Sequence, residues 1–239
     1  MNSRRKIFID SSQRSYGETY NFNMLLREPI HNVKGIRLTE AYIPNSFYNV
    51  NSTFGNTITL TDGGGTDTLT ISSGNYPIST LLSTIQTAAN ASGTLSQTYT
   101  LTYSGVTGKV TISCTGNFSI TTTSLSSKLG YKVSTGLNTS HVGDSLADLR
   151  PTKNVFVAIL NLPVYSNFNE VVNGCIGSVP ISETFLSTMR SDIDYDMIQL
   201  RNTNTIDSLN ICLFDDQGRI LENNNVEWSC CLEIEIDEV

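Results

Sequence analysis

The sequence is poor in charged residues and in histidine and has no long apolar run, and each shortage excludes a class of function. Charged residues make up 15% of the chain, and the formal net charge is −7. Nucleic-acid binding depends on clustered Lys and Arg, so a general role of that kind is excluded. No apolar run approaches the roughly 18 residues of a membrane span, and the basic N-terminal segment lacks the apolar core of a signal peptide. We therefore expect a protein that neither spans a membrane nor is secreted by a standard signal.

Motifs for catalysis and for metal binding are also missing. Neither His31 nor His141 lies close in sequence to a candidate nucleophile, and the chain has no G-x-S-x-G, P-loop or G-x-G-x-x-G motif. Gly63-Gly64-Gly65 lies between two strand-like runs, where we expect a flexible turn. The cysteines are Cys114, Cys175, Cys212, Cys230 and Cys231. They form no C-x-x-C pair and are interpreted as small buried hydrophobic residues in a reducing compartment. We predict no enzyme, no metal site and no cofactor.

Charge is distributed unevenly along the chain. Residues 54–140 hold only three basic and two acidic residues, and roughly two-fifths of them are Ser or Thr. The remainder holds twelve basic and twenty acidic residues. This change in composition predicts two domains, one formed by residues 1–53 and 141–239 and the other by the insertion 54–140.

The larger domain contains eight strand-like runs and no β-α-β alternation. The runs cover residues 6–9, 20–25, 33–43, 154–162, 172–181, 197–201, 208–214 and 226–236. Eight antiparallel strands are too many for one flat sheet, so an all-β fold, an eight-stranded antiparallel jelly-roll sandwich, is predicted. The last two runs flank Asp215-Asp216-Gln217-Gly218 and are predicted to form a hairpin that closes one sheet.

The insertion has a mixed pattern that predicts a small α+β subdomain. Strands are expected at 57–61, 67–72, 98–103, 110–113 and 118–120. Apolar residues at helical spacing follow Pro77 and end before Asn90, which predicts a helix between them. A second, short helix is expected to be capped by Ser124 and ended by Gly130.

Several short motifs occur in an order that resembles penton-type minor capsid proteins, which form the vertices of virophages, polinton-like viruses and related large DNA viruses. The motifs are Ile7–Arg14, Glu40–Asn45, Gly74-Asn75-Tyr76, Lys128-Leu129-Gly130-Tyr131, Asp215–Arg219 and Asn223–Ser229. One departure is Pro77, where that family often has a helix-capping Thr. The motifs span most of the chain.

The resemblance implies a structural role. It implies a homopentamer that fills the vertex of an icosahedral virion and contacts trimers of a double jelly-roll major capsid protein. The insertion would face outward, where it could meet a host receptor. The protein would belong to the virion capsid and would assemble in the interior of the host cell, without secretion.

The basic cluster Arg4, Arg5 and Lys6 precedes the first predicted strand. One interpretation is a frayed, solubilising terminus. The other, which the resemblance favours, is an arm that reaches the capsid interior, towards a neighbouring shell protein or the packaged genome. Any contact with nucleic acid is expected only through this arm.

Three carboxylates alternate in Asp192-Ile193-Asp194-Tyr195-Asp196. The glycine and the distal glutamate of a calcium loop are missing, so a solvated acidic turn is the plain interpretation. An opportunistic cation site is one alternative. The other is a subunit-contact patch of Asp192, Asp194 and Asp196 with the nearby Arg190 and Arg201.

A rival function from another class is host attachment, as a fibre-head module that recognises a cell-surface glycan. Tyr76, Tyr99, Tyr103 and Tyr131 of the insertion would offer stacking surfaces, or would pack in its core. A jelly-roll glycan hydrolase is disfavoured because no pair of carboxylates in a cleft can be identified.

Overall fold

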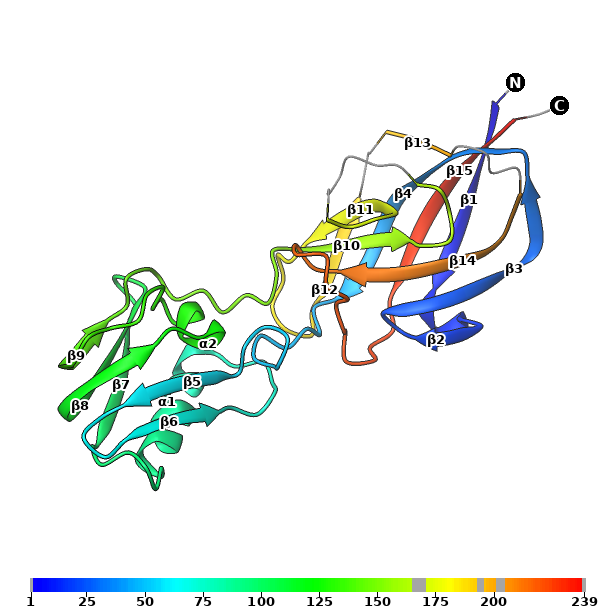
Figure 1. Ribbon diagram of the computed structural model, residues 1–239. Helices are drawn as coiled ribbons and strands as arrows, with labels where there is room; N and C mark the ends of the chain where they lie inside the picture. The colour runs from blue at the N-terminus through cyan, green and yellow to red at the C-terminus, as the bar shows by residue number, and fades with distance from the viewer. Residues whose placement is uncertain (1, 165–170, 193–195, 201–204, 238–239) are drawn as a thin grey trace. The chain divides into compact units, whose positions relative to one another are not determined.

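The computed structural model describes residues 2–164, 171–192, 196–200 and 205–237 (Figure 1). The chain divides into two compact units, one formed by Met1–Phe47 with Thr152–Val239 and the other by Tyr48–Pro151. The predicted boundaries at 54 and 140 therefore need correction. Position 140 lies inside the strand β9 (Asn138–Val142), which is hydrogen-bonded to β8 (Lys109–Thr121) and cannot be separated from it.

The first unit is a sandwich of two antiparallel sheets (Figure 1). One sheet has the strand order β1-β15-β4-β12, and β13 also pairs with β4. These strands are β1 (Asn2–Asp10), β4 (Val33–Pro44), β12 (Thr188–Asp192), β13 (Ile198–Gln199) and β15 (Ser229–Asp237). The short 3-10 helix η1 (Ser11–Gln13) follows β1.

The second sheet of this unit has the order β11-β10-β14-β3-β2. Its strands are β2 (Tyr16–Glu18), β3 (Asn21–His31), β10 (Asn154–Ile159), β11 (Cys175–Pro180) and β14 (Thr205–Phe214). Apolar residues at alternate positions of both sheets form the core, as expected for a pleated strand with one buried face. In β15, for example, Cys230, Leu232 and Ile234 are buried while Cys231 and Glu235 are half-buried.

The predicted jelly-roll class is confirmed, but the described part of this unit has ten strands rather than eight. The additional strands are β2 and β12. In β2 all three residues are exposed, and Gly17 interrupts any apolar pattern. In β12, Met189 is the one buried side chain that the structure describes. Both strands are formed by backbone hydrogen bonds to a neighbouring strand, β3 for β2 and β4 for β12. Such pairing does not require an alternating apolar pattern, so the sequence gives little sign of either strand.

The predicted hairpin of the last two strands is wrong. β14 pairs with β10 and β3, whereas β15 pairs with β1 and β4, so the two strands belong to opposite sheets. The turn after β14 reverses the chain only briefly, through a single bridge between Phe214 and Ile220. The chain then crosses to the other sheet through a segment in which Asn224 and Asn225 both have positive φ values, 53° and 58°.

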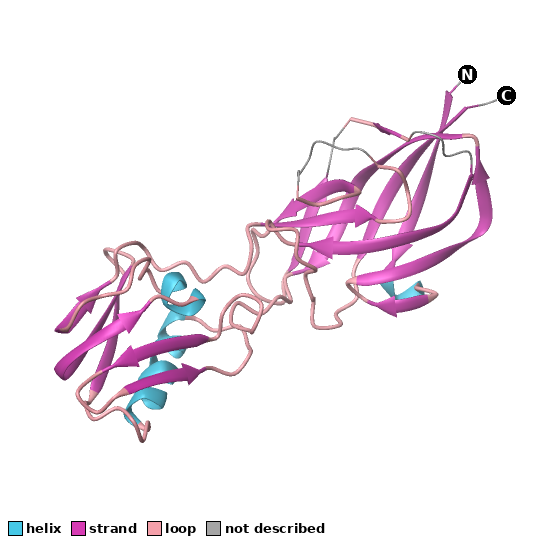
Figure 2. Ribbon diagram, viewed as in Figure 1, coloured by secondary structure: helices cyan, strands magenta, loops and turns pink. Residues whose placement is uncertain are grey.

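The second unit is a small α+β fold, as predicted, and it contains both α-helices (Figure 2). Its sheet has the order β6-β5-β8-β7, and β9 also pairs with β8. The remaining elements are β5 (Thr57–Thr61), β6 (Thr66–Thr70), α1 (Ile78–Asn90), β7 (Tyr99–Ser104) and α2 (Ser124–Lys128). The strands expected at 110–113 and 118–120 are one strand, β8, with a register shift between Ser113 and Phe118.

Local signals set the ends of the two helices. α1 begins after Pro77, whose side chain makes no cap hydrogen bond. α2 is capped by Thr123 rather than by the expected Ser124, because Thr123 and Ser126 form a reciprocal capping box. Gly130 follows α2 with φ of 100°, and a Cβ there would lie 2.3 Å from the carbonyl oxygen of Ser145. The predicted glycine terminator is therefore required by both backbone conformation and space.

Candidate functional site

The two histidines are engaged within the fold. His31 Nδ1 lies 3.0 Å from Thr205 Oγ1, and His141 Nε2 lies 2.9 Å from the carbonyl oxygen of Phe118. In the part of the chain that the structure describes, no group of three or more His, Cys, Asp or Glu side chains is placed to hold a metal ion. Within the same residues, no helix has the length and apolar character needed to span a membrane.

All five cysteines are free thiols. Cys175, Cys212 and Cys230 are buried, as predicted, whereas Cys114 and Cys231 are only half-buried. Burial raises the pKa of Cys175 to about 11 and that of Cys212 to about 12. Burial also raises the pKa of Cys230. Because the thiolate is the nucleophilic form, these buried thiols are poor nucleophiles near neutral pH.

Motifs from both ends of the sequence meet in one cluster of the first unit. The backbone N–H of Trp228 donates to Ser11 Oγ at 2.9 Å, and the Ser11 hydroxyl donates to Glu227. Arg14 forms an ion pair with Glu227 at 2.8 Å. The indole Nε1 of Trp228 donates to the carbonyl oxygen of Thr19 at 2.6 Å. These residues tie the segment after β1 to the segment before β15, so their role is structural.

The Asp215–Arg219 motif is a rigid turn. The Asp215 carboxylate accepts two backbone N–H groups of the turn and pairs with Arg219 Nε at 2.7 Å. Gly218 has φ of 73°, and a Cβ there would lie within 3 Å of a neighbouring carbonyl oxygen. Asp216 accepts hydrogen bonds from residues 152–154. Burial opposes its ionisation, but these bonds outweigh burial and lower the pKa of Asp216.

The sandwich is open along one side, between β1 and β3. β1 pairs with β15, and no described strand pairs with its other side. β3 is covered there by β2 only at Asn21–Asn23. A groove of about 690 Å³ lies along this open edge. It is lined by Arg5, Ile7, Phe8, Gln13, Met24, Leu25, Leu26, Arg27, Glu28 and Ile30.

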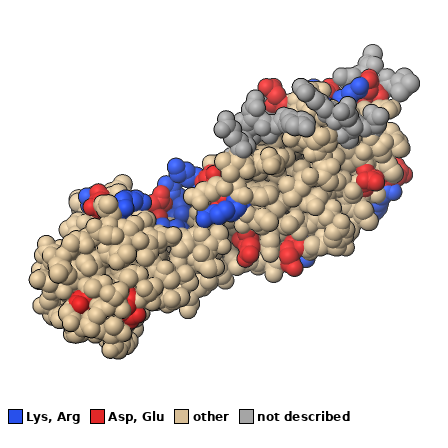
Figure 3. Space-filling view, viewed as in Figure 1, with Lys and Arg blue, Asp and Glu red and all other residues tan. Residues whose placement is uncertain are grey.

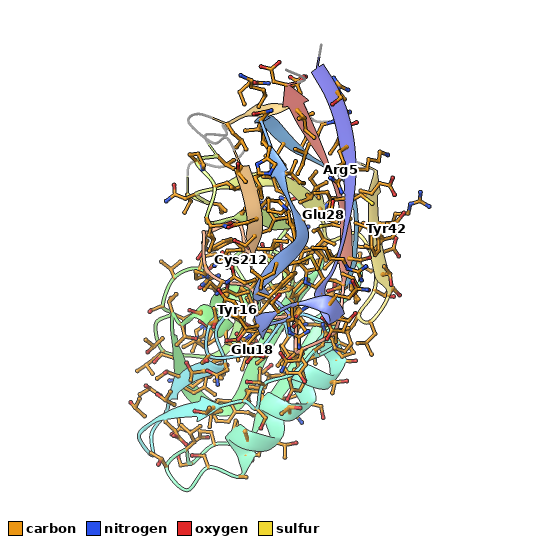
Figure 4. All side chains as sticks on the ribbon, turned by 90° about the vertical axis from the view of Figure 1, so that its right-hand side faces the viewer. Arg5, Tyr16, Glu18, Glu28, Tyr42 and Cys212 are labelled. Atoms are coloured by element: carbon orange, nitrogen blue, oxygen red, sulfur yellow. The ribbon has the colours of Figure 1, made fainter. Side chains whose placement is uncertain are left out.

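This groove combines exposed apolar side chains with charged side chains that have no partner among the described residues. Phe8 is 59% exposed and Leu25 is 63% exposed. Figure 4 shows Arg5 on β1 and Glu28 on β3 at the two sides of the opening. Within the described residues, the side chains of Arg5, Arg27 and Glu28 take part in no ion pair or hydrogen bond. An exposed strand edge with these features is suited to contact another chain.

The basic cluster at the N-terminus is part of β1, so the expectation that it precedes the first strand is wrong. Arg4, Arg5 and Lys6 lie in register with residues 233–235 of β15. Arg4 Nη1 is 3.9 Å from Glu233 Oε2, and Lys6 Nζ is 3.9 Å from Glu40 Oε1. The segment is thus hydrogen-bonded to β15 as a strand. A contact of this cluster with the capsid interior stays a prediction.

The acidic segment continues from β12. Asp196 is exposed, while Asp194, Arg201 and the side chain of Asp192 lie outside the described residues. The guanidinium of Arg190 lies 5.5 Å from the centre of the Tyr42 ring, a cation–π contact. A role of this segment in subunit contact stays a prediction.

In the second unit, one carboxylate joins the β5–β6 turn to the start of β7. Asp62 accepts the N–H of Gly64 at 2.8 Å and those of Ser96 and Gln97 at 3.0 Å, and it accepts the hydroxyl of Tyr99 at 3.2 Å. Burial raises the pKa of Asp62, but these hydrogen bonds outweigh it and the net effect lowers the pKa. The glycine-rich turn, expected to be flexible, is thus held by Asp62.

The tyrosines of the second unit divide between core and surface. Tyr99 and Tyr131 are at most 1% exposed, so they pack in the core, and Tyr76 is half-buried against it. Tyr103 is 43% exposed. It borders a groove of about 340 Å³ between α1 and β7. The other lining residues are Ile78, Ser79, Leu82, Ser83, Gln86 and Leu101.

We compared the chain with known protein families and with known proteins. A family described as "Family of unknown function (DUF5901)" matches residues 3–219. The chain belongs to this family. A comparison with curated proteins found no match.

Its fold is similar to that of the mavirus penton protein, known from a crystal structure of the selenomethionine-labelled protein. The TM-score is 0.57 and the sequence identity 8%, and the likeness covers 98% of this chain and 99% of that chain. An identity this low shows a common fold and no more. The resemblance to penton-type proteins, first suggested by short motifs, is confirmed at that level.

The open edge was not predicted from the sequence. The strand-like run 6–9 and the run 20–25 indicated two of its strands, but which strands lie at the edges depends on pairing between distant segments. One signal was available. Arg27-Glu28-Pro29 interrupts the apolar alternation of β3, and charges and proline are typical of edge strands.

Proposed function

We propose that this protein is a penton, a structural protein that forms the vertex of an icosahedral virus capsid as a homopentamer and has no catalytic role. The observation that carries the proposal is the fold it shares with the mavirus penton protein over nearly the full length of both chains. The agreement of motif order with penton-type proteins supports it independently, because the fold likeness is found at only 8% sequence identity.

The two edge strands of one sheet in the first unit are compatible with a ring of subunits. A closed ring requires each subunit to present two different, complementary surfaces. The sheet β1-β15-β4-β12 ends in β1 on one side and in β12 on the other, so the unit has two unlike edges. In the assembled particle, the pentamer would contact trimers of a double jelly-roll major capsid protein. We propose assembly inside the host cell.

The second unit, residues 48–151, would face outward. On the face seen in Figure 3, most of its surface carries no charged side chain. Most of its exposed residues within 54–140 are Ser, Thr, Asn and Gly, which are hydrated without a strong field. Such a surface suits an exterior domain that stays hydrated.

Electron microscopy of the purified full-length chain tests the proposal. We expect ring-shaped particles with five-fold symmetry in class averages. Co-expression with the major capsid protein of the same virus should add these rings at particle vertices. Particles with three-fold symmetry, or rings that never enter the shell, would contradict the proposed function.

We propose as a second function that the groove beside Tyr103 binds a neutral carbohydrate of a host surface. Sugar rings stack on exposed aromatic faces and bond to neutral polar groups, and the groove offers both. Gln86 Oε1 accepts the backbone N–H of Leu101 at 2.9 Å, which fixes the orientation of its amide group. Ser79 and Ser83 add exposed hydroxyls one helical turn apart, and no charged residue lines the groove.

A panel of neutral oligosaccharides, applied to the full-length protein, tests this second function. We expect binding that is lost in Tyr103→Ala and Gln86→Ala and kept in Tyr76→Phe, which leaves the groove intact. Retention of binding by Tyr103→Ala, or absence of binding to every neutral sugar, would contradict it. The vertex function would stand in either case.

A further inference from the structure

We propose that in the ring the loop 183–187 of one copy inserts into the β1/β3 groove of the next copy, with Leu186 on the groove floor and Glu183 paired with Arg5. This inference rests on the proposed pentamer and names the surfaces that form it. The occupant of the groove is thus a second copy of this chain.

The loop between β11 and β12 is built to expose an apolar side chain. Leu186 has φ of 68°, a left-handed conformation that is costly for a residue with a branched side chain, and it is 65% exposed. The fold imposes this conformation through backbone hydrogen bonds. Leu186 N–H donates to Asn45 O at 2.8 Å, Asn45 N–H donates to Ser187 O at 2.9 Å, and Ser187 N–H donates to Thr184 O at 3.0 Å. The hydrogen bonds fix the loop in a strained conformation that exposes the leucine side chain. We therefore expect this side chain to pack against a partner surface.

The groove between β1 and β3 is large enough to take part of this loop and has an apolar floor. Its volume of about 690 Å³ is ample for a leucine side chain with its neighbours. Met24 and Ile30 are buried beneath it and Ile7 is half-buried, so its floor is apolar. Burying a leucine there is favourable by roughly the amount expected for transfer from water to a protein core.

Charges on the two surfaces are complementary. Arg5, Arg27 and Glu28 line the groove and have no ion-pair partner among the described residues, so the groove carries one net positive charge. Glu183 at the start of the loop and Asp196 beyond β12 are exposed, and they flank β12, which lies at the opposite end of the sheet from β1. Opposite charges across an interface set its register and disfavour wrong pairings.

The placement of the two surfaces fits a closed ring. β1 ends its sheet on one side, and β12, which follows the loop, ends the same sheet on the other side. Each copy can therefore give its loop to one neighbour and receive the loop of the other. This is the heterologous contact from which rings are made. The unpaired edge of β1 is covered in the process, which removes a site for uncontrolled strand addition.

Leu186→Gly is the sharpest test, because glycine adopts a positive φ without strain and the variant removes only the inserted side chain. Native mass spectrometry and sedimentation of the full-length protein should show subunit association weakened by at least about tenfold. Leu137→Gly is the matched control, since Leu137 is 69% exposed in the other unit. It should leave association unchanged.

A charge swap tests the pairing of Glu183 with Arg5. Arg5→Glu and Glu183→Arg should each weaken association by about tenfold, and the double variant should regain most of the loss. A pentamer that tolerates Leu186→Gly, or a double variant no better than the singles, would overturn this interface and leave the vertex function standing. A ring of another size that depends on Leu186 would support the interface and contradict the pentamer. A wild-type chain that stays monomeric would contradict both.

Discussion

The sheets of the two units carry different kinds of side-chain pair on their outer faces. The sandwich carries charged pairs on the outer face of a sheet, such as Arg37 with Glu233 at 2.6 Å. The smaller unit uses hydroxyls in the same position, as in the cross-strand pair of Thr59 and Thr68 at 2.9 Å. The sandwich leaves the β1/β3 edge open along an apolar groove, whereas the exposed residues of the smaller unit within 54–140 are mostly Ser, Thr, Asn and Gly. In the proposed assembly, this difference assigns the contacts with other chains to the sandwich and not to the smaller unit.

The largest expected effect tests whether the sandwich unfolds separately. Leu213 in β14 is fully buried, so Leu213→Ala should lower the free energy of unfolding of the sandwich by about 3 kcal/mol. Trp228 is the single tryptophan of the chain and lies in this unit, so its fluorescence reports the transition. Amide exchange of β8 in the smaller unit should not change. An equal loss of protection in β8 would show that the units are coupled.

The next effect concerns the smaller unit. Asp62→Ala removes the acceptor of the buried Tyr99 hydroxyl and of three partly buried backbone N–H groups. It should lower the free energy of unfolding of that unit by about 2 to 3 kcal/mol. Amide exchange at Ser96 and Gln97 should accelerate, while the Trp228 transition stays in place. Asp67→Ala is the control. Among the described residues Asp67 accepts a single side-chain hydrogen bond, from Ser92 at 2.5 Å, so this substitution should cost about 1 kcal/mol.

Acid should weaken the smaller unit through the same carboxylate. The pKa of Asp62 is lower in the folded than in the unfolded chain, so the stabilisation is complete above the unfolded value of about 4. It is lost as the pH falls through the folded value. Amide exchange of the smaller unit, followed from about pH 5 to about pH 2, should show this loss in the wild type. In Asp62→Asn the dependence should be flatter, and an identical profile would assign the acid sensitivity to another group.

The smallest expected effect on stability distinguishes Thr123 from Ser124 as the N-cap of α2. Thr123→Ala should lower the free energy of unfolding of the smaller unit by about 1 kcal/mol, because it removes the capping box. Ser124→Ala should change it by less than about 0.5 kcal/mol, since Ser124 is exposed. The reverse order would show that the sequence-based choice of Ser124 was right.

Local patterns predicted most elements, and pairing between distant segments decided the rest. The alternation of Leu209, Ile211 and Leu213 with polar residues identified β14, and the spacing after Pro77 identified α1. The same alternation could not reveal that β14 and β15 lie in opposite sheets. That outcome depends on the crossing at Asn223–Trp228, where Asn223 and Trp228 are buried and hydrogen-bonded to residues near the N-terminus.

The residues of the candidate interface could not be identified from local sequence patterns either. Arg4, Arg5 and Lys6 were grouped as one basic cluster, but pairing with β15 gives them different roles. Arg4 and Lys6 form ion pairs on the outer face, and Arg5 faces the groove. Leu186 could not be singled out, because its exposure and its positive φ arise from hydrogen bonds to Asn45, about 140 positions earlier in the sequence.

Native mass of the purified full-length chain tests the central claim most directly. A pentamer of the 26.2-kDa chain has a mass of about 131 kDa. We predict this species as the dominant form, with release of monomers in Leu186→Gly. A chain that remains a monomer or forms a trimer at every concentration tested would contradict the account.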